Sequence, residues 1–77
     1  MVIGFIFIKT HSKEEVKTYR LLREIPEIIE INPLFGDYDI IAKVEAKDFK
    51  DLSMIVLNKI RKIPGVVDTM TMPGIKI

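Results

Sequence analysis

The chain has 77 residues, 48% hydrophobic and 30% charged, a balance typical of one small globular domain rather than a disordered segment. Its net charge of +1 gives no indication of binding to nucleic acid or to an anionic membrane. With no cysteine and one histidine, disulfides, thiolate metal sites and a histidine-rich metal site within one subunit are excluded. A core this small is marginally stable alone, which favours a dimer or larger assembly.

The first predicted element is a strand over residues 2–8, a run of β-branched and aromatic residues that is apolar on both faces. The run is too short to span a bilayer and lacks the flanks of a signal peptide, so we expect a cytoplasmic protein. Helices of the same chain can cover one face of this strand, and a second subunit is the simplest cover for the other.

A helix is predicted next, with Ser12 as its N-cap and Glu15 completing a capping box. Pro26 ends it, because the residue before a proline avoids the α region. Its apolar stripe is made of Val16, Tyr19 and Leu22.

Two strands should follow, over residues 27–32 and Tyr38–Glu45, joined as an antiparallel hairpin through Pro33 and Gly36. Asp48 is the expected N-cap of a second helix, which Pro64-Gly65 ends before a last strand over residues 66–72. The apolar stripe of that helix is Phe49, Leu52, Val56, Ile60 and Ile63.

The chain carries a faint internal repeat, because residues 25–30 (IPEIIE) match residues 63–68 (IPGVVD) at a shift of 38 positions. Two such halves predict an α+β fold, the ferredoxin-like βαββαβ sandwich. It has a four-stranded antiparallel sheet in the order 4-1-3-2, with two helices on one face. The open face of the sheet is expected to dimerise sheet to sheet.

Asp39 is the first candidate for a ligand contact. Gly36 and Asp37 are typical of an ordinary hairpin turn, which remains an alternative for the whole stretch. Asp39, however, is predicted to lie inside a strand, where aspartate is disfavoured and its carboxylate needs a partner. A ligand ammonium group is one such partner.

Thr69 and Thr71 are the second candidate, because residues two apart share one face of a strand. Their hydroxyls could bind a small polar ligand on the open face of the sheet, or they could be strand formers only. His11 could act as a general base, but no serine or carboxylate constellation is specified around it, so a loop or capping role is favoured.

The order and spacing of these motifs resemble the effector domain of the Lrp/AsnC regulators, called RAM. The resemblance rests on Gly36-Asp37-Tyr38-Asp39, the turn Pro64-Gly65-Val66 and Thr69-Met70-Thr71, and it covers the chain from Val2 to about Met72. It implies a non-enzymatic module without a cofactor or metal. Subunits would pair sheet to sheet, and dimers would assemble into an eight-subunit ring, an octamer, with an amino acid effector bound between dimers.

By the same resemblance, five residues would line the effector site: Gly36, Tyr38, Asp39, Thr69 and Thr71. Asp39 would bind the α-ammonium group of the amino acid, and backbone amides of the turn would bind its carboxylate. The module would act on amino acid metabolism or transcription, with Lrp/AsnC-type regulators as partners.

The sequence departs from the family pattern in two respects. It lacks a helix-turn-helix half, so residues 1–77 are expected to be a single RAM-like effector domain, either a stand-alone protein or an excised domain, that binds no DNA by itself. Pro73-Gly74 also falls where the family continues a strand, so we expect a break or bulge there.

Two alternatives share this strand plan. One is a small dimeric α+β barrel enzyme of the monooxygenase or isomerase sort, in which His11 and Asp39 would be the acid–base groups. The other is an ACT-like regulatory domain, whose sheets pair side by side. The two-sided apolar first strand favours pairing face to face.

Overall fold

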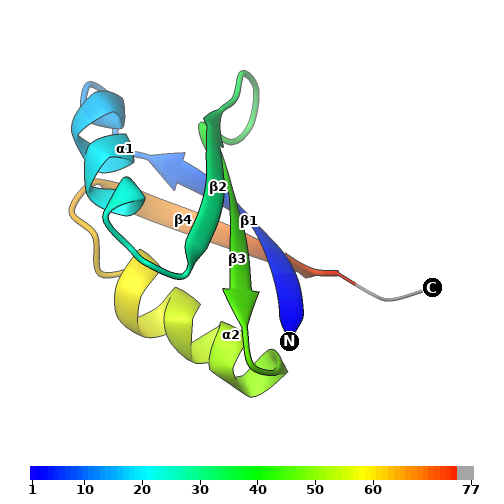
Figure 1. Cartoon of the computed structure of the whole chain (residues 1–77). Helices are drawn as coiled ribbons and strands as arrows, with labels where there is room; N and C mark the ends of the chain where they lie inside the picture. Colours follow the sequence, from blue (N-terminus) through cyan, green and yellow to red (C-terminus); the bar gives the residue numbers. More distant parts are fainter. Residues whose placement is uncertain (75–77) are drawn as a thin grey trace.

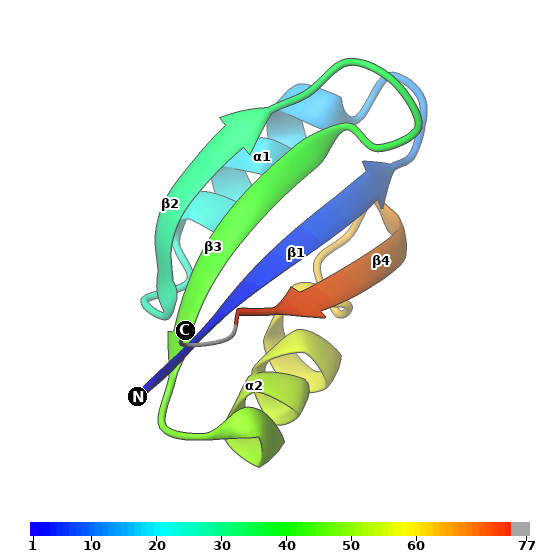
Figure 2. The same cartoon turned by 90° about the vertical axis from the view of Figure 1, so that its right-hand side faces the viewer.

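The computed structural model describes residues 1–74 as a four-stranded antiparallel sheet with helices on one face (Figure 1). The strands are β1 (Val2–Thr10), β2 (Ile28–Pro33), β3 (Ile40–Ala46) and β4 (Val66–Pro73). The helices are α1 (Glu15–Arg23) and α2 (Phe49–Ile55), and α2 continues as the π-helical segment η1 (Val56–Ile60). The strand order is β2-β3-β1-β4, as predicted, and Figure 2 shows both helices behind the sheet.

The hydrophobic core lies between the sheet and the helix layer. The central strand β1 turns Ile6 and Ile8 into it, and both are completely buried. Alternate residues of β1, including Phe5 and Phe7, face the other way and remain partly exposed. β1 is therefore apolar on both faces, as predicted, and its second face is only partly covered within this chain.

The predicted capping box at Ser12 is wrong. Residues 12 and 13 form a turn in which Lys13 has a positive φ of 71°, and the Glu14 N–H donates to the His11 carbonyl. Helix α1 consequently begins at Glu15, with Glu14 at the N-cap and no side-chain cap among the described residues. Val16 then lies in the first turn, where it is 65% exposed instead of contributing to the core.

The predicted cap of the second helix is confirmed. The Asp48 carboxylate accepts the Asp51 N–H at 2.8 Å, and the Asp51 carboxylate accepts the Lys47 N–H at 2.9 Å. This reciprocal pair satisfies donors that helix geometry leaves free at an N-terminus. The apolar stripe differs at its first member, because Phe49 is 53% exposed while Leu52 is buried.

Both edge strands carry a β-bulge at equivalent positions of the internal repeat. In β2 the register shifts between Ile28 and Glu30, and in β4 it shifts opposite Lys9 and Thr10, where Val67 is the extra residue. Ile29 and Val67 are 38 positions apart, and both are more than half exposed. A bulge bends an edge strand and discourages pairing with another sheet edge.

β4 ends at Pro73, where a break or bulge was expected. Pro73 still pairs with Gly4, and the Gly74 N–H donates to the Ile3 carbonyl at 2.7 Å. The residues after Gly74 lie outside those that the structure describes. Proline is tolerated because β4 is an edge strand, where one missing backbone donor can face solvent. The irregularity in the β1–β4 register lies instead at the opposite end of the strand.

A close contact joins α1 to the turn before β4. The hydroxyl of Thr18, which is completely buried, donates to the Pro64 carbonyl at 3.1 Å. Gly65 has a φ of +94°, and its carbonyl accepts the His11 N–H at 2.7 Å. A β-carbon at Gly65 would lie 2.0 Å from the Thr18 hydroxyl oxygen, so the site admits only glycine without rearrangement.

An ion pair joins the start of β2 to η1. The Glu27 carboxylate accepts a hydrogen bond from Lys59, and this bond holds the pKa of Glu27 below its ordinary value of 4.5, although burial opposes it. Because the folded pKa is the lower one, the pair stabilises the fold above pH 4.5. That contribution is lost as the pH falls through the folded pKa.

We therefore expect Glu27→Gln to lower the melting temperature at pH 7 by roughly 1–5 °C, as suits a partly exposed pair in a small domain. The gap from wild type should narrow as the pH falls through the lowered pKa of Glu27, because the wild-type carboxylate then takes up a proton. Thermal unfolding followed by circular dichroism measures it, with Glu24→Gln, an exposed carboxylate, as the control. A gap that stays constant over this pH range would contradict the assignment.

Candidate functional site

The loop between β2 and β3 projects beyond the end of the sheet (Figures 1 and 2). Its base is closed by the Leu34 N–H, which donates to the Asp39 carbonyl at 2.8 Å. Gly36 has a φ of +117°, and a β-carbon added there would meet no heavy atom of the described residues within 4 Å. Glycine is therefore required here for conformation rather than for space. The side chain of Phe35 beside it is fully exposed.

Tyr38 belongs to the open face of the sheet. Its ring meets Phe7 edge to face, with centroids 5.9 Å apart and planes at 62°. The Lys9 ammonium lies 5.7 Å from the centroid of the same ring. Tyr38 therefore extends the aromatic surface of the open face and places a cation beside it.

Asp39 precedes β3 and does not lie inside it, so the strand argument made for this residue is wrong. Its N–H donates to the Ile8 carbonyl at 2.9 Å. Its carboxylate Oδ2 accepts both the backbone N–H of Thr10 at 2.7 Å and the Thr10 hydroxyl at 3.1 Å. Asp39 thus ties the end of β1 to the start of β3, and Oδ1 retains its acceptor capacity.

Sequence reasoning missed Thr10, which is buried and holds the Asp39 carboxylate. A signal was present, because Thr10 is the first hydroxyl after a long apolar run. Only the register of β1 against β3, however, shows that it lies beside Asp39.

A hollow of about 240 Å³ opens between α1 and the β2–β3 hairpin. We call it the α1 hollow; Val16, Tyr19, Pro33 and Ile40 provide its apolar lining, and Glu15 and Asp39 its acidic groups. Almost all of its accessible lining is apolar. Such a lining suits an apolar group.

Thr69 and Thr71 face the helices, which corrects their expected place on the open face. They pair with Ile8 and Ile6, whose side chains are completely buried on the helix side. Strict alternation from Val66 would give the opposite face, but the bulge at Val67 shifts the phase by one residue. Met70 and its neighbour Met72 take the open face instead.

The five predicted site residues are only partly brought together. Gly36, Tyr38 and Asp39 share one loop, but Tyr38 lies on the open face while Asp39 lines the α1 hollow. Thr69 lies beyond β1, two strand spacings from β3 and so about 10 Å away. Thr71 is a further two residues along β4.

The remaining candidate, His11, lies on the surface with 68% of its side chain exposed, and its Nδ1 is 3.5 Å from the Glu14 carboxylate. It does not point into a space between sheet and helices, which is where the barrel-enzyme alternative requires it. Within residues 1–74, no cluster of three or more His, Cys, Asp or Glu side chains could hold a metal ion.

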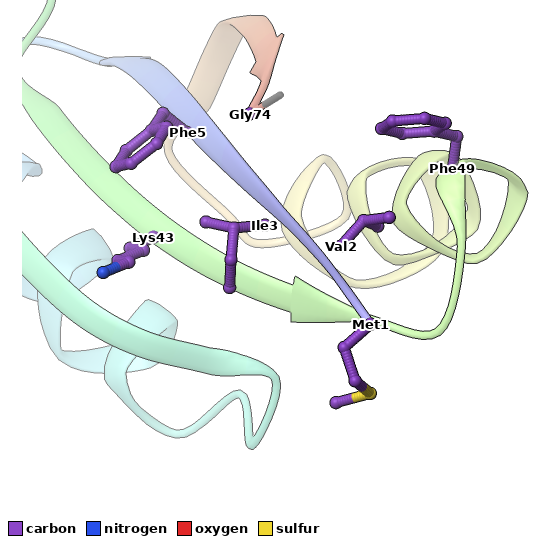
Figure 3. A pocket seen from close by; sticks show the side chains of 7 residues that line it. All are labelled: Met1, Val2, Ile3, Phe5, Lys43, Phe49 and Gly74. Carbon is purple, nitrogen blue, oxygen red and sulfur yellow. The ribbon is translucent and has the colours of Figure 1, made fainter. Parts of the chain in front are cut away.

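A second hollow, of about 600 Å³, lies at the opposite end of the sheet (Figure 3). It is lined by Met1, Val2, Ile3, Phe5, Lys43, Phe49 and Gly74. None of the predicted site residues lines it.

Among the helices of the described residues, none is long and apolar enough to span a membrane.

The strand order and the placement of both helices on one face define a ferredoxin-like domain. The sequence profile of the Lrp/AsnC ligand binding domain matches residues 3–76. The chain belongs to this family, and its homologues include transcriptional regulators.

Two similar proteins illustrate where the domain occurs. The HTH-type transcriptional regulator FL11 of Pyrococcus horikoshii is 33% identical over 75 residues, which are 97% of this chain and 49% of the regulator. A homocitrate synthase of Sulfurisphaera tokodaii is 48% identical over 52 residues, which are 68% of this chain and 11% of that enzyme. The chain therefore spans less than half of these curated relatives.

Among solved structures, that of FFRP-DM1 is similar over nearly the whole length of this chain. The TM-score is 0.91 at 39% sequence identity, covering 97% of this chain and all of that one.

Proposed function

We propose that this chain is an amino-acid-sensing regulatory module that catalyses no reaction and works as a homo-oligomer. Its membership of the Lrp/AsnC ligand-binding family carries the proposal. Within the fold, Asp39 supports it, because Thr10 holds its carboxylate through one oxygen and leaves the other oxygen able to accept a hydrogen bond. Such an oxygen can accept a hydrogen bond from the α-ammonium group of an amino acid.

The open face supports the homodimer part of the proposal. It presents an apolar surface with charged residues among it, and a second copy would cover it sheet to sheet. The apolar members are Ile3, Phe5, Phe7, Ile41, Met70 and Met72. Exposed apolar surface of this kind is typical of interaction sites.

The sheet edges disfavour the side-by-side pairing of ACT-like domains. β2 carries a bulge at Ile29 and ends at Pro33, and β4 carries a bulge at Val67. In β4 the Asp68 carboxylate also accepts the Thr69 N–H, which occupies an edge donor. Assembly through the open face, with dimers joined into an octamer at their hairpin ends, therefore fits this chain better.

In that assembly the amino acid would bind at the hairpin end. Asp39 would accept its ammonium group, and backbone amides around Gly36 would bind its carboxylate. Tyr38 lies on the open face and Thr69 lies two strand spacings from β3, so neither completes a pocket with Asp39 in one chain. Residues of other subunits would therefore contribute. Binding at a shared interface would couple ligand concentration to assembly.

Calorimetric titration of each of the twenty amino acids into the protein tests this function. We expect at least one to bind below millimolar concentration. Asp39→Asn should weaken that binding about 10- to 100-fold, because it removes a charge-assisted hydrogen bond but keeps an oxygen for Thr10. The matched control is Asp37→Asn on the same loop, which should bind as wild type does.

If no amino acid binds, the sensing role is wrong. If Asp39→Asn binds as tightly as wild type, sensing stands but the assignment of Asp39 fails. Because the asparagine variant can still bond with Thr10, a loss of binding would not simply report a loosened hairpin.

We further propose that the 77 residues act as one effector domain that contacts no operator DNA by itself, and passes its signal to a partner. A regulator with the same domain, such as FL11, is the first candidate. A second is a biosynthetic enzyme, since a homocitrate synthase carries a segment 48% identical to this chain. To distinguish these two candidate partners, the chain is mixed with each protein, and the mass of any complex is measured with and without amino acid.

A further inference from the structure

Phe35 is the most exposed large apolar side chain of the described residues, and nothing in the proposed function uses it. It is 107% exposed at the tip of the β2–β3 loop. The loop is not open-ended, since the hydrogen bond between Leu34 and Asp39 closes its base. The aromatic ring of Phe35 is therefore exposed to solvent on a closed loop. Aromatic rings that become buried on association are frequent anchors of protein interfaces.

The α1 hollow is a matching receptor. Its volume of about 240 Å³ exceeds that of a cavity of about 150 Å³ known to hold a benzene ring in another protein. Val16 on its rim is 65% exposed, although it is apolar and lies on a helix. The lining of Val16, Tyr19, Pro33 and Ile40 offers a phenyl ring aliphatic and aromatic contacts.

The projecting ring and the hollow are close neighbours on the same chain. Pro33 of the hollow precedes Phe35 by two residues, so their Cα atoms are at most about 7 Å apart. In Figures 1 and 2, α1 and the hairpin loop lie at the same end of the molecule. Phe35 nevertheless remains outside its own hollow, as its exposure shows.

We infer that Phe35 of one chain inserts into the α1 hollow of a second copy, and that the insertion is reciprocal about a two-fold axis. A ring and a receptor this close on one surface satisfy the self-complementarity that a two-fold interface requires. The contact lies at the hairpin end and is separate from the open face. It would therefore join sheet-to-sheet dimers, and it rests on the assembly part of the proposed function.

The first test is the mass of the assembled chain by light scattering. We expect the wild type to contain four or more chains and Phe35→Ser to contain two. Val16→Asp, which places a charge in the receptor, should give the same result. Met54→Ser, at an exposed apolar residue of α2, is the matched control and should retain the wild-type mass.

The second test uses the absence of cysteine from this chain. Phe35→Cys and Val16→Cys chains, one of them mass-tagged, are mixed under mild oxidation. The mixed disulfide should form at least tenfold faster than that between Phe35→Cys and Met54→Cys. Equal rates overturn the inference.

The results separate this inference from the broader proposal. A wild type of only two chains, or a Phe35→Ser variant of unchanged mass, overturns the inference and leaves the open-face dimer standing. A monomeric wild type overturns both, whereas amino acid binding is measured independently by calorimetry. Circular dichroism of Phe35→Ser checks its folding, which a fully exposed side chain should not affect.

Discussion

Replacing Gly65 with alanine is expected to destabilise the domain by about 2–5 kcal/mol. A positive φ costs an L-residue roughly 1–2 kcal/mol, and displacing the buried Thr18 hydroxyl from the Pro64 carbonyl costs about 1–3 kcal/mol more. This is a large part of the free energy of unfolding of a domain of this length, about 4–12 kcal/mol. Urea unfolding of Gly65→Ala measures the effect, and its melting temperature should fall by roughly 10–40 °C.

Gly36→Ala is the matched control, because Gly36 also has a positive φ but no heavy atom of the described residues near a β-carbon position. It should lose only the conformational part, about 1–2 kcal/mol. In a Thr18→Ala background the Gly65→Ala step should also cost less, since the nearest atom at 2.0 Å is the hydroxyl oxygen. Equal losses for both glycines would show that the contact with Thr18 contributes nothing.

The second large effect is expected at Phe7, at the middle of the open face. Phe7→Asp should raise the dissociation constant of the sheet-to-sheet dimer about 100-fold or more, because a carboxylate would be buried against an apolar partner surface. Sedimentation equilibrium over a range of concentrations measures the change. The expected product is a folded monomer.

Leu57→Asp is the control, since Leu57 is 53% exposed on η1 in the helix layer, away from the open face. That variant should dimerise as wild type does. A Phe7→Asp chain that remains dimeric while folded would contradict the open-face dimer, and circular dichroism excludes unfolding as the cause of monomers.

The strand order was predictable from the sequence because it depends on features that repeat along the chain. The two IP turns at residues 25–26 and 63–64 mark the end of the helix in each half, and the all-apolar β1 requires a central position. These sequence patterns reflect which side chains are buried, and each pattern is spread over many residues, so one irregular position does not hide it. Helix starts are decided by single hydrogen bonds, so the turn at Lys13 could displace the cap predicted at Ser12.

The candidate site was predictable only as a set of residue types. Asp39 needed a partner, as its chemistry demands, but that partner is Thr10, which is 29 residues away and adjacent only through strand register. The prediction that Thr69 and Thr71 share one face is correct, but the predicted face is the wrong one. The bulge at Val67 reverses it, and a bulge cannot be recognised from composition. Long-range pairing, rather than local propensity, decides these details.

The two bulges also determine where this family can gain or lose residues. Deleting the extra residue at Ile29 or Val67 would leave a regular strand whose later side chains keep their faces. Deleting one residue further along, at Met70 for example, would move every following side chain to the opposite face. Gaps in an alignment of related domains should therefore collect at these two positions, and those relatives should still direct the threonines of β4 toward the helices.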